Sequence, residues 1–143
     1  MGILKDVFAP IYENHFFGIY DTAYKPIFSK LYENGGYEKM GYIFILIPLI
    51  LLGLFYFVWR YPYGKIWHWA VWMGIISVFV FISTIGYANK FLADFLLNEE
   101  SRDFTSHIIS QYGFINLFLA FITGFLISIL FKPFSKIQMH LPY

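Results

Sequence analysis

The sequence predicts an all-α integral membrane protein with three transmembrane helices, formed by a helical hairpin plus one helix, and N-terminal amphipathic interfacial helices. Of its 143 residues, 59% are hydrophobic and only 13% are charged, whereas a soluble domain carries about 25% charged residues. Three runs, 40–59, 66–89 and 108–131, contain no Asp, Glu, Lys or Arg. At about 1.5 Å per residue, each run can cross a hydrocarbon core of about 30 Å. This pattern excludes a soluble globular protein and a disordered one.

Residues 1–39 are predicted to form an N-terminal amphipathic interfacial segment, followed by the three-span unit at 40–143. Apolar residues recur at helical spacing, and Pro10 predicts that a first helix ends near it. Pro26 interrupts the pattern of a second helix, which Asp21 or Thr22 could cap and which the turn Asn34-Gly35-Gly36 should stop. The segment carries four lysines and five acidic residues, whereas helices that bind anionic lipid are strongly basic. The balanced charge therefore favours packing against a partner protein.

The first two spans are predicted to be antiparallel neighbours, because only the short turn 60–65 joins them. Pro48 lies inside the first span and has no N–H group, so a helix kink is expected there. Such a kink can line a transport pathway, but irregular helices are common in membranes, and we favour that simpler interpretation. Aromatic and basic residues around the turn predict a belt at one membrane surface. These interfacial anchors are Trp59, Arg60, Tyr61, Tyr63, Lys65, Trp67, Trp69 and Trp72.

The polar connection 90–107 is expected to begin as an amphipathic extension of the second span and to break at 98–101. The third span is expected to end before Pro133. Small residues recur every four positions within spans two and three, which lets helix backbones approach closely. This stripe could pack within the three spans or against another chain, and the sequence favours neither. The candidate packing or partner-interface residues are Ala70, Gly74, Ala120, Gly124 and Ser128, with Asn116 as an interhelical hydrogen-bonding group.

The absence of charged residues from the spans limits the chemistry of the chain. Proton relays, ion-coupled transporters and voltage sensors require ionisable groups at membrane depth. The sequence has no cysteine, phosphate loop or nucleophile elbow. His68 and His107 border opposite ends of the spans, so haem held between two histidines is not expected. No catalytic residue, metal ligand, nucleic-acid partner or small-molecule substrate is inferred, and a structural phospholipid is the only ligand considered.

These features predict a non-catalytic accessory subunit of a larger membrane complex, with other membrane subunits and the lipid bilayer as partners. The composition has no cysteine and is rich in Phe, Tyr and Ile, which is typical of AT-biased coding sequences. It suggests, more specifically, a supernumerary subunit of a respiratory-chain or ATP-synthase complex. Its location would be an energy-transducing inner membrane, mitochondrial or bacterial. Two alternatives are a small self-associating pore or holin-like protein, and an immunity or chaperone-like membrane binding protein.

The orientation follows from the charges flanking the spans. The net charges are −1 for 1–39, +2 for 60–65, −2 for 90–107 and +2 for 132–143. The positive-inside rule then places the N-terminus outside and the C-terminus inside. Lys and Arg counted alone point the other way, with six on the N-terminal side against four.

Overall fold

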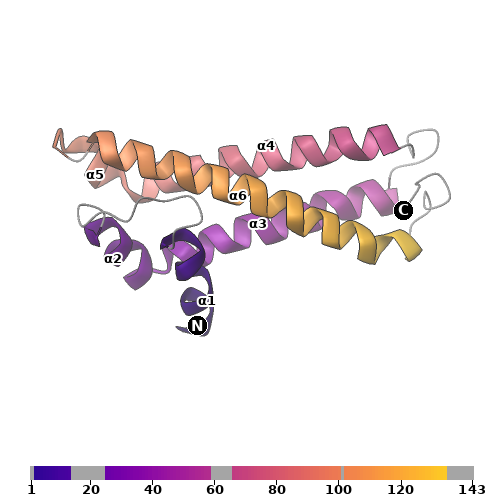
Figure 1. Ribbon diagram of the computed structural model, residues 1–143, viewed down its shortest axis with the longest axis horizontal. Helices are drawn as coiled ribbons and strands as arrows, with labels where there is room; N and C mark the ends of the chain where they lie inside the picture. The colour runs from indigo at the N-terminus through magenta and orange to yellow at the C-terminus, as the bar shows by residue number, and fades with distance from the viewer. Residues whose placement is uncertain (1, 14–24, 59–65, 101, 135–143) are drawn as a thin grey trace.

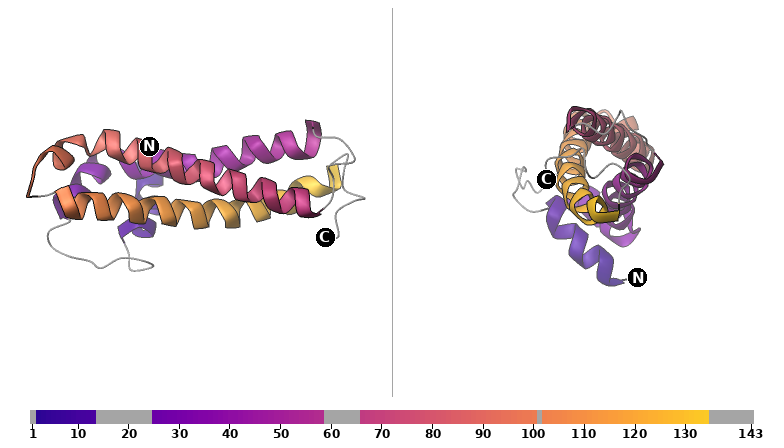
Figure 2. Two further views of the ribbon diagram at one scale, coloured as in Figure 1. Left: turned by 90° about the horizontal axis from the view of Figure 1, so that it is seen from above. Right: turned by 90° about the vertical axis from the view of Figure 1, so that its right-hand side faces the viewer.

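The computed structural model describes residues 2–13, 25–58, 66–100 and 102–134, and the regular elements within these ranges are all helical. Three long helices form an elongated bundle: α3 (Gly36–Gly53) with the π-helical turn η2 (Leu54–Val58), α4 (Ile66–Phe91) and α6 (Arg102–Phe131) (Figure 1). Consecutive long helices run antiparallel, and the end-on view in Figure 2 places all three around one axis. Three segments, Gly36–Val58, Ile66–Phe91 and Thr105–Phe134, are long and apolar enough to cross a membrane. The prediction of an all-helical chain with three candidate spans is confirmed.

The long helices extend beyond the uncharged runs that revealed them. α3 begins four residues earlier than expected, directly after Gly35, whose φ of +68° lies in the left-handed region that favours glycine. α6 begins at Arg102 and includes the polar residues that precede the third run. A charge-free run reports the depth of hydrocarbon, whereas backbone hydrogen bonds continue into water, so the two boundaries differ.

Prolines account for two differences at the N-terminal end. α1 (Gly2–Glu13) continues past Pro10, so the expected helix end there is wrong. Pro10 and Asp6 are both exposed, so water can hydrogen-bond the Asp6 carbonyl, which Pro10 cannot pair because it has no N–H. Pro26 is the second residue of α2 (Lys25–Glu33), in the first turn, where a helix does not need that N–H group. The candidate caps Asp21 and Thr22 lie outside the described residues.

Three further irregularities in the helices lie after Gly53, at Leu92 and after Phe131. α3 remains helical through Pro48, which is buried, and the departure from α-helical geometry comes later, at η2. The amphipathic extension after α4 is not continuous, because Leu92 interrupts it before the short helix α5 (Ala93–Leu97). α6 ends at Phe131, and the 3-10 turn η3 (Lys132–Phe134) contains Pro133.

The two N-terminal helices pack at the end of the bundle that also carries α5 (Figure 1). The Phe8 ring of α1 lies edge-on to Phe44 of α3, with 5.8 Å between ring centroids. A Cβ atom on Gly41 would lie 2.7 Å from that Phe8 ring, so glycine allows the close approach. α2 contributes Lys30, whose Nζ lies 3.2 Å from a carboxylate oxygen of Asp94. These contacts connect both N-terminal helices to the bundle.

Candidate functional site

The interior of the bundle is uncharged. The buried polar side chains within the described ranges are Ser77, Thr84, Thr105, Asn116 and Ser128. Among the same residues, no group of three or more His, Asp or Glu side chains could hold a metal ion. The buried polar side chains offer hydrogen-bonding groups for helix packing.

Asn116 connects all three long helices at one buried point. Its Nδ2 atom donates to the backbone carbonyl oxygen of Met40 in α3, at 3.1 Å, and to Thr84 Oγ1 in α4, at 2.8 Å. Thr84 Oγ1 in turn donates to the carbonyl oxygen of Val80, at 2.8 Å. Asn116, Met40 and Thr84 have no exposed surface. This junction fixes the relative height of the three helices, since sliding one helix would break a buried hydrogen bond.

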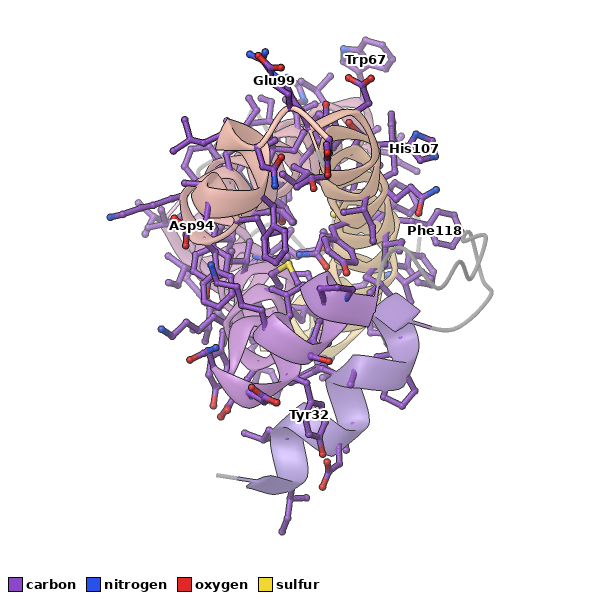
Figure 3. The ribbon with its side chains drawn as sticks, turned by 90° about the vertical axis from the view of Figure 1, so that its left-hand side faces the viewer. Tyr32, Trp67, Asp94, Glu99, His107 and Phe118 are labelled. Atoms are coloured by element: carbon purple, nitrogen blue, oxygen red, sulfur yellow. The ribbon has the colours of Figure 1, made fainter. Side chains whose placement is uncertain are left out.

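Two tryptophans of α4 join the long helices toward the end of the bundle that lies away from α5. Trp69 Nε1 donates to Ser128 Oγ at 3.0 Å, and Trp72 Nε1 donates to the carbonyl oxygen of Leu51 at 2.9 Å. Both tryptophans are half-buried, whereas Trp67 is 71% exposed and points away from the bundle in Figure 3. Of the predicted anchors, Trp67 thus has the outward position of a belt residue. Trp59, Arg60, Tyr61, Tyr63 and Lys65 lie outside the described residues.

The small residues of α6 face the inside of the bundle. Ala120 and Ser128 are fully buried, and Gly124 is buried between them. A Cβ atom on Gly124 would lie 2.7 Å from Met73 Cε of α4. Of the two packing interpretations that the sequence leaves open, the structure uses this part of the stripe for packing within the chain.

The small residues of α4 face outward instead. Ala70 and Gly74 are exposed, and a Cβ atom on Gly74 would have no neighbour within 4 Å. Gly74 lies in a shallow apolar groove of about 440 Å³, which we call the α4 groove. It is lined by Val71, Gly74, Ile75, Val78, Phe79 and Ile82. A second hollow of about 260 Å³ adjoins it through Val71 and Ile75, and is also lined by Phe55, Trp67, His68 and Trp72.

Several packing residues were not expected from the sequence. Gly41 and Gly113 both allow close approach, since a Cβ atom on Gly113 would lie 2.9 Å from Phe81 and Ile85 of α4. Tyr37 and Tyr112 are buried, with 3.4 Å between their hydroxyl oxygens. The small-residue spacing could have indicated the glycines, but nothing in the sequence pairs the two tyrosines.

His68 and His107 stay apart, in agreement with their expected places at opposite ends of the bundle. His68 is in the first turn of α4. His107 is near the start of α6, where its Nε2 lies 3.0 Å from Gln111 Nε2. His15 and His140 lie outside the described residues.

Comparison of the chain with known protein families, curated proteins and solved structures found no match. In the described part of the chain, the fold is a helical bundle with three candidate membrane-spanning helices, no charged side chain in its interior and largely apolar outer faces.

Proposed function

We propose that this chain is a membrane-embedded, non-catalytic accessory subunit that packs against another membrane protein. The outward faces of the three long helices are rich in exposed Leu, Ile, Val and Phe side chains, a surface that favours lipid or protein over water. Among the residues that the structure describes, the buried side chains of the bundle carry no charge. Transport through a single copy has no support in such an interior.

The α4 groove is the observation that carries the partner proposal. α3 and α6 present large side chains outward, among them Leu49, Phe118 and Phe121. α4 presents Ala70 and Gly74, and its backbone is open to the outside at Gly74. In membranes, helices associate where small residues allow close backbone contact, because lipid already satisfies apolar side chains. We therefore assign the partner helix to the α4 groove.

The more specific proposal is a supernumerary subunit of a respiratory-chain or ATP-synthase complex in an energy-transducing inner membrane. Its support is the cysteine-free, Phe-, Tyr- and Ile-rich composition. The charges flanking the spans support an outside N-terminus and an inside C-terminus. A structural phospholipid against the apolar faces fits the same proposal.

Replacing Gly74 with leucine should weaken the association with the partner. The added side chain would fill the α4 groove, and overpacking of a helix contact costs about 1–3 kcal/mol, or roughly 5- to 150-fold in affinity. The measurement is the amount of unlike subunits that co-purify with the chain in mild detergent, quantified by mass spectrometry.

Gly86→Leu is the matched control, because Gly86 is also in α4 and a Cβ atom there would meet nothing within 4 Å. Gly86 is 12 residues from Gly74, so at about 100° per residue it faces roughly 120° away. The control should leave co-purification unchanged. If Gly74→Leu co-purified with as much of the unlike subunits as the unmodified chain does, the α4 groove would not be part of the interface. A pure homo-oligomer that conducts ions would contradict the accessory role and favour the pore alternative.

A further inference from the structure

We propose that α1 is an in-plane lipid-binding helix, which lies in the membrane interface and buries Leu4 and Val7 among lipid chains. The inference rests on the proposed membrane location of the bundle, and it names the lipid bilayer as the occupant of an apolar surface that the rest of the described chain leaves uncovered. Leu4 is 38% exposed and Val7 is 55% exposed.

The position of α1 along the bundle supports this proposal. Phe8 and Ala9 are buried, and Phe8 packs against Gly41 and Phe44 of α3. Both contact residues belong to the first part of the uncharged run 40–59, where α3 enters the proposed hydrocarbon region. α1 is therefore attached at the depth where apolar and polar parts of a membrane meet, not beyond the end of the bundle.

The direction of α1 also fits a membrane surface. α1 runs crosswise to the long axis of the bundle and projects away from it, with its N-terminal end outermost (Figures 1 and 2). If the bundle crosses the membrane, a helix in this direction lies along the membrane plane. Interfacial amphipathic helices have this arrangement, with the apolar face buried about 5–10 Å into the headgroup and acyl boundary.

The polar contacts of α1 set which side faces the hydrocarbon. Asp6 accepts a hydrogen bond from the hydroxyl of Tyr32 in α2. α2 lies nearer than α1 to the end of the bundle that carries α5, and Figure 3 shows Tyr32 beside α1 from that end. At about 100° per residue, Leu4 lies roughly 160° around the helix from Asp6, and Val7 lies about 100° away. The Asp6 carboxylate thus faces the end of the bundle that carries α5. The Leu4 side of α1 faces the opposite way, toward the middle of the bundle's length.

Lipid explains this exposed surface better than a charged protein partner does. α3, to which α1 is attached, also has an apolar outer face, where Leu46, Leu49 and Ile50 are exposed. α1 contains one Lys, one Asp and one Glu, so it has no excess positive charge for anionic headgroups. The balanced charge of residues 1–39, which on sequence grounds favours a protein partner, disfavours anionic lipid but not neutral lipid, because the contact would depend on apolar burial.

Site-directed spin labelling can test the proposal cleanly, because the chain has no cysteine and each introduced one is a unique attachment point. Leu4→Cys, Val7→Cys, Ile122→Cys and Glu99→Cys would be labelled in the full chain, reconstituted in phosphatidylcholine nanodiscs. Ile122 is on the outer face of α6, and Glu99 is exposed at the bundle end (Figure 3). Labels in lipid collide mainly with oxygen, and labels in water collide mainly with a soluble nickel complex.

We expect labels at positions 4 and 7 to resemble the label at 122, with an oxygen-to-nickel ratio several-fold above that at 99. Adding phosphatidylglycerol should leave the ratio unchanged. A nickel-dominated ratio at 4 and 7, with 122 still oxygen-dominated, would overturn the α1 proposal and leave the membrane bundle intact. Protection from both reagents at 4 and 7 would assign the surface to protein. A nickel-dominated ratio at 122 would overturn the membrane location itself.

Discussion

Asn116→Asp is expected to destabilise the bundle by about 3–5 kcal/mol, the usual cost of an unpaired buried charge. The amide nitrogen of Asn116 donates to Met40 O and Thr84 Oγ1 in a site without exposed surface. A carboxylate of nearly the same shape has no N–H to give, and it would face the Met40 carbonyl oxygen with two acceptors in contact. The measurement is the free energy of unfolding in mixed micelles, followed by tryptophan fluorescence.

Two further variants separate the hydrogen bonds from the shape of the side chain. Thr84→Val removes one acceptor and should cost about 1 kcal/mol, in the range of interhelical hydrogen bonds in membranes. Asn116→Leu removes the donor and leaves the Met40 carbonyl with its own helical partner, so its cost should fall between the other two. Equal stability of Asn116→Asp and the unmodified chain would mean that water reaches this junction.

The long helices were predictable because the bilayer imposes a simple length rule. A run of 20 or more residues without charge has no other common structure, so 40–59, 66–89 and 108–131 mark three helices. The same rule says nothing about the helix ends. Gly35 and Leu92 set two of the boundaries by local backbone conformation, and only the glycine has a clear sequence signal.

The packing of the helices was predictable only in part. Asn116 is the most polar residue at membrane depth, so its role in an interhelical hydrogen bond follows from energy alone. Its partners depend on how far each helix slides and rotates, which no single helix specifies. The small-residue stripes show the same limit: Ala120, Gly124 and Ser128 turned inward, whereas Ala70 and Gly74 turned outward, although the spacing of both is identical.

This opposite placement gives the sharpest test of the fold, because the same substitution should destabilise the chain at one glycine and not at the other. Gly124→Leu would push a branched side chain against Met73 and Leu52, since even a Cβ atom there lies 2.7 Å from Met73 Cε and 3.5 Å from Leu52 Cδ1. Overpacking of this kind costs about 1–3 kcal/mol. It would also separate α6 from α4 near the Trp69–Ser128 hydrogen bond, so the tryptophan emission of the folded state should shift.

Gly74→Leu should instead leave the isolated chain as stable as before or stabilise it by up to about 1 kcal/mol. Glycine loses more backbone freedom than leucine when a helix forms, so leucine has the higher helix propensity. Gly124→Ala provides the intermediate case, since the flexible end of Met73 can move away from a single methyl group. Unfolding of the three purified variants in mixed micelles measures the effect. Unchanged stability of Gly124→Leu, together with loss of a co-purifying subunit, would place the α6 stripe at an interface between chains. Loss of stability in Gly124→Leu, with the subunit still co-purifying with Gly124→Ala, would place the stripe inside this bundle.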